Sequence, residues 1–251
     1  MKTDFAIFLI AFAITAVYFI VANFQDTTGF LQTIAFVAIA GISIAILKHN
    51  RSDDIYYSNL TVRDLALTAL ATAGMVAVSA VFTGVIGASV LRTQSLAVIN
   101  GTGQPSSLFT VTLSLVLFTV CIVAAAEELF KLAGYAELKV RKGRIIAAAV
   151  VVGFWALYHG LQSYNNLLMV IPAFINGLIL IALLETNPKS FFRPWLAHGL
   201  YNAVSVIAGV IQGTAGGLPL FPTQWNTADL LLPGLAALWL ALIILPALRR
   251  K

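Results

Sequence analysis

Three groups of polar residues interrupt otherwise apolar stretches of this sequence, and their types suit acid–base chemistry. In chain order they are Glu127 and Glu128 with Lys131, then His159, and then His198 with Asn202. Carboxylates and imidazoles exchange protons with water near neutral pH, and imidazole and amide N–H groups stabilise an oxyanion. Hydrolysis of a peptide bond needs both, because water must be activated, the oxyanion stabilised and the leaving amine protonated.

Helical geometry predicts which of these side chains share a face. Residues four apart lie on one face of an α-helix, so His198 lies on the face of Asn202 and Glu127 on the face of Lys131. Glu127 and Glu128 are about 100° apart around the axis. We therefore expect one glutamate to face the site, while the other supports it or pairs with Lys131.

The surroundings of these groups exclude a water-soluble fold. Hydrophobic residues make up 60% of the 251 residues and charged residues only 10%, against roughly a quarter charged in ordinary soluble domains. The net charge of +5 does not indicate a nucleic-acid partner, because the basic residues form short clusters between apolar runs. The single cysteine, Cys121, lies in an apolar run and is expected to be a buried hydrophobe.

Eight apolar runs qualify as helices that cross a bilayer core of about 30 Å, although the fifth and seventh are short. They are approximately Phe5–Phe24, Phe30–Leu47, Leu65–Val90, Leu108–Tyr135, Ile145–Leu161, Leu167–Leu184, Trp195–Ile211 and Leu230–Leu248. Their composition lacks the strict alternation of barrel strands, which predicts helices. We therefore predict an all-α, polytopic transmembrane helical bundle of about eight spans, forming a single integral membrane domain over residues 1–251.

The basic residues fall on one side of this eight-span arrangement. That side carries Lys2, Lys48, Arg51, Arg63, Lys139, Arg141, Lys142, Arg144, Lys189, Arg193, Arg249, Arg250 and Lys251. The opposite loops carry only Arg92. The positive-inside rule then places both termini in the cytoplasm, at the plasma membrane if the source is prokaryotic. Asp64, at the mouth of the third span, is expected to be a solvated interfacial residue.

Ionisable side chains inside a span cost about 2.5–3.5 kcal/mol on insertion scales and are functional candidates by default. The three groups fall in the fourth, fifth and seventh runs, so we place a catalytic core over about residues 108–211. The depth of one candidate residue in the bilayer does not fit the eight-span arrangement. His198 is only five positions from Arg193, so either the segment before the seventh span dips into the bilayer or that span tilts strongly.

The three motifs resemble those of the CAAX-processing and bacteriocin-processing intramembrane endopeptidases, the CPBP or Abi superfamily. That family shows EExxxR, then FxxxH, then HxxxN or HxxxD, on successive helices of an eight-span fold. The matching residues, in the matching order, are Glu127, Glu128, His159, His198 and Asn202. The resemblance covers roughly residues 124–202, and the span count extends it to the whole chain.

Two positions depart from the family pattern. The family's arginine would fall at Leu132, whereas Lys131 stands one place earlier. The resulting EExxK resembles the PrsW-type proteases, whose second motif usually ends in Glu where this chain has His159. Trp155, beside Phe154, stands where the family has phenylalanine. The resemblance therefore indicates the superfamily and leaves the CAAX-type and PrsW-type subfamilies both open.

The resemblance implies an endopeptidase that acts on a membrane-associated substrate. In that scheme Glu127 is the general base on water and His159 helps to hold the water. His198 and Asn202 donate hydrogen bonds to the oxyanion, and Glu128 is a supporting carboxylate. The implied partners are the lipid bilayer and either a prenylated CAAX carboxyl terminus or a membrane-tethered peptide, with no nucleic acid.

Zinc is the alternative chemistry. Two histidines and a carboxylate are a common catalytic zinc set, which here would be His159, His198 and Glu127. The sequence contains no HExxH motif. We expect metal-independent catalysis without a cofactor, and zinc stays the alternative.

Two non-enzyme functions also stay open. Buried glutamates and histidines form proton relays in transporters, although the matched halves of an inverted repeat are not seen here. A catalytically silent scaffold is the other possibility, like the gamma-secretase scaffold subunit of the same superfamily. The presence of both histidines, Asn202 and the glutamate pair favours an active site.

Overall fold

The computed structural model describes residues 3–24, 27–49, 61–86, 107–162, 169–186, 191–213, 221 and 227–248. Every regular element in these ranges is a helix. The helices are α1 (Thr3–Ala22), α2 (Thr27–His49), α3 (Val62–Ile86), α5 (Leu108–Leu117), a π-helix (Phe118–Val123), α6 (Ala124–Lys142), α7 (Arg144–Gln162), α8 (Val170–Thr186), α9 (Phe192–Gly213) and α10 (Thr227–Leu248). The all-α prediction is confirmed.

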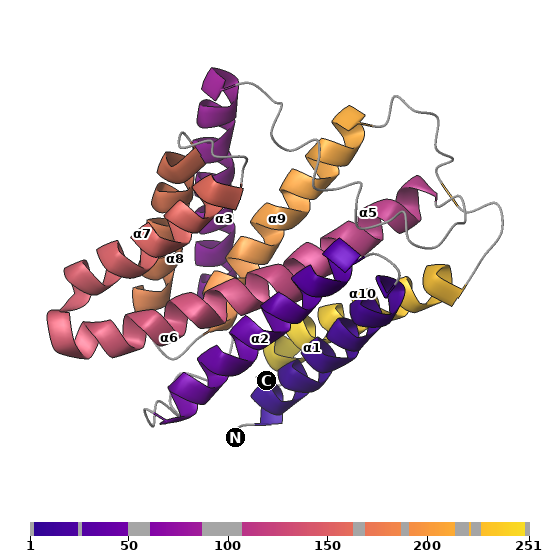
Figure 1. The fold of residues 1–251 in the computed structure, drawn as a ribbon, viewed down its shortest axis with the longest axis horizontal. Helices are drawn as coiled ribbons and strands as arrows, with labels where there is room; N and C mark the ends of the chain where they lie inside the picture. The colour runs from indigo at the N-terminus through magenta and orange to yellow at the C-terminus, as the bar shows by residue number, and fades with distance from the viewer. Residues whose placement is uncertain are drawn as a thin grey trace.

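Each predicted apolar run corresponds to helix over most of the part that the structure describes, while residues 87–90 of the third run and 167–168 of the sixth lie outside the described residues. The fourth run is continuous through α5, the π-helix and α6, and it ends at Lys142 rather than at Tyr135. Gly143 stops it because its φ of 81° is left-handed, a conformation that glycine adopts without strain. α7 then starts at Arg144, so α6 and α7 form a tight helical hairpin (Figure 1).

Helix length and composition agree with a membrane protein. Three of the described helices are long and apolar enough to cross a bilayer: Thr27–His49, Val62–Phe82 and Leu108–Lys142. Four shorter apolar helices accompany them: Ala6–Ala22, Arg144–Gly160, Val170–Thr186 and Asp229–Ala241. The start of α1 and the end of α10 lie at the same end of the bundle (Figure 1), as an even number of spans requires. That this end faces the cytoplasm stays a prediction.

An aromatic cluster fixes the beginning of α9. Phe8 of α1 is fully buried, and its ring centroid lies 5.3 Å from that of Phe191, 5.7 Å from that of Phe192 and 5.5 Å from that of Trp195. Trp239 of α10 lies 5.6 Å from Phe8 in the same way. Edge-on ring contacts at these distances are favourable beyond their area burial, so α1 and α10 hold the N-terminal end of α9 in place.

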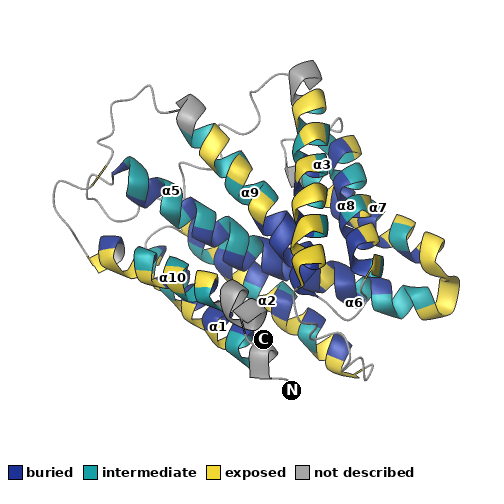
Figure 2. Ribbon diagram, turned by 180° about the vertical axis from the view of Figure 1, so that it is seen from behind, coloured by how far each residue is buried: buried dark blue, intermediate teal, exposed yellow. Residues whose placement is uncertain are grey.

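The opposite side of α9 packs against α3. The Thr72 hydroxyl donates to the Ala197 carbonyl at 3.3 Å, and the Ser79 hydroxyl lies 2.8 Å from the Tyr201 hydroxyl. Met75 is fully buried in the same interface. The outer face of α3 is exposed, whereas the buried residues gather where α6 and α9 meet (Figure 2). α9 is therefore held on both sides along the turns that contain the third motif.

The prediction for Asp64 is wrong. Asp64 is 3% exposed and forms an ion pair with Arg193, which is 4% exposed. Asp64 also accepts the Thr61 N–H at 2.7 Å in a capping box at the start of α3, and Arg193 donates to Thr186 at 2.8 Å. Local capping and a long-range partner together favour burial over solvation. Because Arg193 is covered by protein and paired with Asp64, it is not a solvated flanking residue, and its position does not by itself fix the depth of His198 in the bilayer.

Candidate active site

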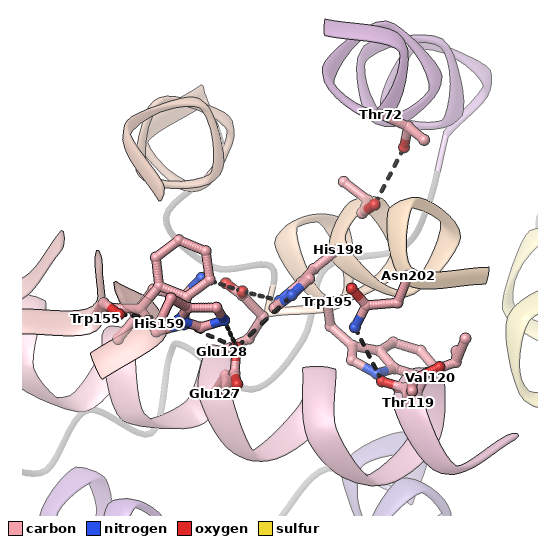
Figure 3. Close-up of polar contacts among 12 residues, drawn as sticks. Thr72, Thr119, Val120, Glu127, Glu128, Trp155, His159, Trp195, His198 and Asn202 are labelled. Atoms are coloured by element: carbon pink, nitrogen blue, oxygen red, sulfur yellow. Dashed lines mark hydrogen bonds and ion pairs between the residues drawn. The ribbon is translucent and has the colours of Figure 1, made fainter. Parts of the chain in front are cut away.

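Four of the five predicted site residues converge where α6, α7 and α9 meet (Figure 3). Glu127 Oε2 lies 3.8 Å from His159 Nε2 and 3.7 Å from His198 Nε2. Glu128 Oε1 lies 2.7 Å from His198 Nδ1. Both glutamates and His198 are buried, whereas the His159 side chain is 29% exposed. His159 is therefore the most exposed of these four side chains.

Hydrogen bonds determine where the histidine protons lie. His159 Nδ1 is 2.9 Å from the Trp155 carbonyl oxygen, which can only accept, so Nδ1 carries a hydrogen. His198 Nδ1 faces a Glu128 carboxylate oxygen and donates in the same way. Both rings consequently turn Nε2 towards the same oxygen of Glu127. The gaps of 3.7 and 3.8 Å are too long for direct hydrogen bonds and are suited to a shared water.

Glu128 and Lys131 form a buried ion pair one helical turn apart. Lys131 is 1% exposed, so its charge is fully desolvated. One glutamate thus faces the two Nε2 atoms while the other supports the site, as the 100° offset predicted. The lysine pairs with Glu128, however, and not with Glu127, whose face it was expected to share.

The indole of Trp155 is a part of the site that the sequence analysis missed. Its Nε1–H donates to Glu127 Oε2 at 2.8 Å, and the Lys131 ammonium lies 3.8 Å from its ring centroid. The sequence contained two indications that Trp155 belongs to the site. Trp155 is four residues before His159 and shares its helix face, and a buried indole N–H needs an acceptor.

Asn202 lies one turn after His198 on α9 and is not among the four residues that converge. Its Nδ2 donates to the backbone carbonyl of Thr119 at 3.2 Å (Figure 3). That bond uses one of the two amide hydrogens. The structure therefore gives Asn202 a backbone partner in the π-helix, and its hydrogen bond to an oxyanion stays a prediction.

The π-helix, directly before α6, contacts α9 through the following residues. Trp195 Nε1 donates to the Val120 carbonyl at 2.9 Å, next to the bond from Asn202 to Thr119. Between these two residues of α9 lies Gly199, where a Cβ would come within 2.8 Å of Val120 Cγ1. Wide π turns inside α-helices occur frequently at functional sites. Here the wide turn sets the position of α9 relative to the two glutamates.

The zinc alternative concerns His159, His198 and Glu127. Glu127 Oε2 lies 3.8 and 3.7 Å from the Nε2 atoms of these histidines and accepts the Trp155 indole N–H. Within the ranges that the structure describes, no group of three or more His, Cys, Asp or Glu side chains is already placed to hold a metal ion. Whether catalysis depends on zinc stays a prediction for experiment.

Comparison with known proteins identifies the same region. Residues 109–204 match the family model described as type II CAAX prenyl endopeptidase Rce1-like. The matched segment runs from α5 to α9 and contains all three motifs. The chain matches no curated protein and no solved structure. With its long apolar helices, the protein is an integral membrane protein. Over residues 109–204 the chain is similar to the Rce1-like family of the CPBP or Abi superfamily, a family of intramembrane proteases.

Proposed function

We propose that this chain is an intramembrane endopeptidase in which Glu127 activates water against a peptide bond. One observation carries the proposal. A single carboxylate oxygen lies 3.7 and 3.8 Å from two imidazole Nε2 atoms whose Nδ1 atoms are already engaged. A water held at that point contacts a base and a second acceptor at once, as general base catalysis requires.

The hydrolytic step follows from these contacts. A water donates one hydrogen bond to Glu127 and the other to the Nε2 lone pair of His159. Glu127 takes a proton as the water oxygen attacks the carbonyl carbon, and the carbonyl electrons move onto the oxygen. The C–N bond then breaks, and Glu127 returns the proton to the leaving amine. Glu127 ends in its starting state.

His198 and Asn202 are the proposed donors to the oxyanion. His198 already donates through Nδ1 to Glu128, so a donor at Nε2 as well requires the imidazolium form. A protonated His198 donates through Nδ1 to Glu128 and through Nε2 to the oxyanion. Asn202 would use the amide hydrogen that does not bond Thr119.

The proposed substrate is a prenylated protein carboxyl terminus. The family description supports this class, since it names CAAX prenyl endopeptidases. The surroundings of the accessible histidine support it too. Phe154 and Leu157, on the helix that carries His159, are 70% and 51% exposed, and Phe130 of α6 is 42% exposed. These apolar side chains suit a lipid chain that enters from the bilayer.

The test uses purified protein in lipid vesicles with three peptides. They are a farnesylated CAAX peptide, the same peptide without the lipid, and a transmembrane peptide. We expect wild type to cleave the farnesylated peptide and Glu127→Gln to cleave none. Absence of cleavage by wild type would favour a silent scaffold. Proton flux across the vesicle that Glu127→Gln abolishes, without any cleavage, would identify a transporter.

Zinc-dependent hydrolysis is the second candidate. Its support is that both histidines have Nδ1 bonded to an oxygen acceptor, which is typical of zinc-bound histidines. His159, His198 and Glu127 would be the ligands. Metal content and resistance to chelators distinguish the two chemistries.

A further inference from the structure

Two buried side chains at the site have no role in the hydrolytic step, namely Trp155 and Lys131. We propose that Trp155 is a positioning residue for Glu127 and that Lys131 strengthens this contact across the indole ring. The inference rests on the proposed function, because the carboxylate that Trp155 positions is the proposed base.

Trp155 contacts two members of the site through different atoms. Its indole N–H donates to Glu127 Oε2 at 2.8 Å, and its backbone carbonyl accepts from His159 Nδ1 at 2.9 Å. The ring also packs against His159, with 4.3 Å between centroids. One residue therefore fixes both the rotamer of the base and the tautomer of the histidine proposed to hold the water. A phenylalanine here would still pack but would have no donor for Glu127.

The indole ring has little freedom to move. It is 5% exposed, and α8 presents Gly177 to its edge. A Cβ at Gly177 would lie 3.0 Å from Trp155 Cε3 and 2.6 Å from Val152 Cγ1. α8 is therefore in contact with the ring on that side. A hydrogen bond from a ring confined in this way orients its acceptor strongly.

Lys131 connects the two halves of the site. Its ammonium lies 3.8 Å from the centre of the Trp155 ring and pairs with Glu128, which in turn bonds His198. A cation over the face of an indole is attracted by the ring electrons. It draws electron density from the ring, which makes the N–H a stronger donor. The charge of Lys131 thus reaches Glu127 through the indole and His198 through Glu128.

The first test compares two tryptophan substitutions. Trp155→Phe removes the donor to Glu127. Trp239→Phe is the matched control, because Trp239 is also buried and donates its indole N–H at 3.1 Å, but to the Thr15 hydroxyl. We expect Trp155→Phe to lower kcat by about 10- to 100-fold, the range for loss of a hydrogen bond to a charged group, with KM unchanged. Trp239→Phe should leave the kcat of the folded fraction unchanged. Equal kcat values for the two variants would overturn the inference.

The second test does not depend on activity. The chain has four tryptophans, and ¹⁵N labelling gives each an indole N–H signal in NMR spectra. The Trp155 signal is the one that disappears in Trp155→Phe. We expect it to move in both Glu127→Gln and Lys131→Met, while the Trp239 signal stays in place. If the chemical shift of the Trp155 indole N–H were the same in Glu127→Gln as in wild type, the inference would be overturned. An inactive wild type whose Trp155 signal responds to both changes would refute the proposed function while supporting the contact.

Discussion

The bundle holds two buried clusters of charge, one at Asp64 and Arg193 and the other around the two glutamates of α6. The first sets one carboxylate against one guanidinium, and its members also bond Thr61 and Thr186. The second sets Glu127 and Glu128 against a single ammonium and places two imidazole Nε2 atoms beside them. Both clusters are almost fully shielded from the surroundings.

What separates the two clusters is the state of their charges and donors. The cluster at Asp64 is balanced in charge and ties the start of α3 to the start of α9. The cluster at Glu127 has two carboxylates for one ammonium, and its central oxygen is near two imidazole nitrogens without bonding either directly. Burial of charge alone is therefore weak support for catalysis. A carboxylate without a lysine or arginine partner, beside imidazole nitrogens that it does not bond, is stronger support, and the predictions below test that distinction.

The largest effect is expected from Glu127→Gln. Loss of the base should lower kcat by about 10⁴-fold, the upper end of the contribution of a general base. The melting temperature should stay level or rise, because an amide is cheaper to bury than a carboxylate. Peptide cleavage and thermal unfolding measure the two quantities.

Glu128→Gln is the matched control on the next residue. It leaves Lys131 buried without its carboxylate partner, so both stability and kcat should fall. If the Glu127→Gln variant cleaved the peptide near the normal rate and the Glu128→Gln variant did not, the general base would be Glu128.

The next-largest effect is expected on stability, from breaking the ion pair of Asp64 and Arg193. Asp64→Asn or Arg193→Met leaves one buried charge unpaired and should lower the free energy of unfolding by about 3–5 kcal/mol. The double variant should recover much of that loss, because neither charge remains. Denaturant unfolding measures the free energy of unfolding of each variant, and kcat per folded molecule should be unchanged. A large loss of kcat at normal stability would mean that this cluster takes part in the chemistry.

His198→Ala and Asn202→Ala test the proposed oxyanion donors. Each should lower kcat by about 10²–10³-fold, as expected for loss of one donor, and purified protein should remain active in strong chelators with less than one zinc per chain. Zinc catalysis predicts another pattern. His198→Ala would then release metal, and Asn202→Ala would be much milder, since an amide is a poor zinc ligand. One bound zinc per chain with a mild Asn202 variant would refute the glutamate mechanism.

The smallest effect tests the contact between α9 and the π-helix. A Cβ at Gly199 would lie 2.8 Å from Val120 Cγ1, whereas one at Gly209, on the same helix, meets nothing within 4 Å. Gly199→Ala should therefore cost about 1–3 kcal/mol of stability and lower kcat, because α9 carries His198. Gly209→Ala should be neutral or slightly stabilising. Equal melting temperatures for both variants would show that the approach of α9 is not tight.

The helices and the four converging side chains were predictable because each depends on a local rule. Apolar runs of sufficient length have few alternatives to a helix in a bilayer. The 100° offset between Glu127 and Glu128 predicted that one faces the histidines and the other supports the site. That His159 and His198 meet Glu127 followed only from the family resemblance, since spacing within one helix says nothing about a second helix.

The one wrong prediction and the features that the sequence analysis did not predict share a cause, which is partners distant in the sequence. Asp64 looked solvated because Arg193, its counterion, is on another helix. The backbone partner of Asn202 is the carbonyl of Thr119, which belongs to the π-helix and also accepts the Ala124 N–H. The π-helix itself has no sequence signature. Trp155 was noticed only as a departure from phenylalanine, and its role became apparent from the position of Glu127.

The π-helix makes the chain sensitive to the number of codons between α5 and α6. A π turn contains about one residue more than an α turn. Deleting one residue from Phe118–Val123 would replace the wide turn by an α turn, so α5 and α6 would form one uninterrupted α-helix with little change in their relative rotation. The wide turn whose carbonyls bond Trp195 and Asn202 would be lost. A single three-nucleotide deletion here would therefore change how α9 is held while every proposed catalytic side chain remained encoded and on the same helix face.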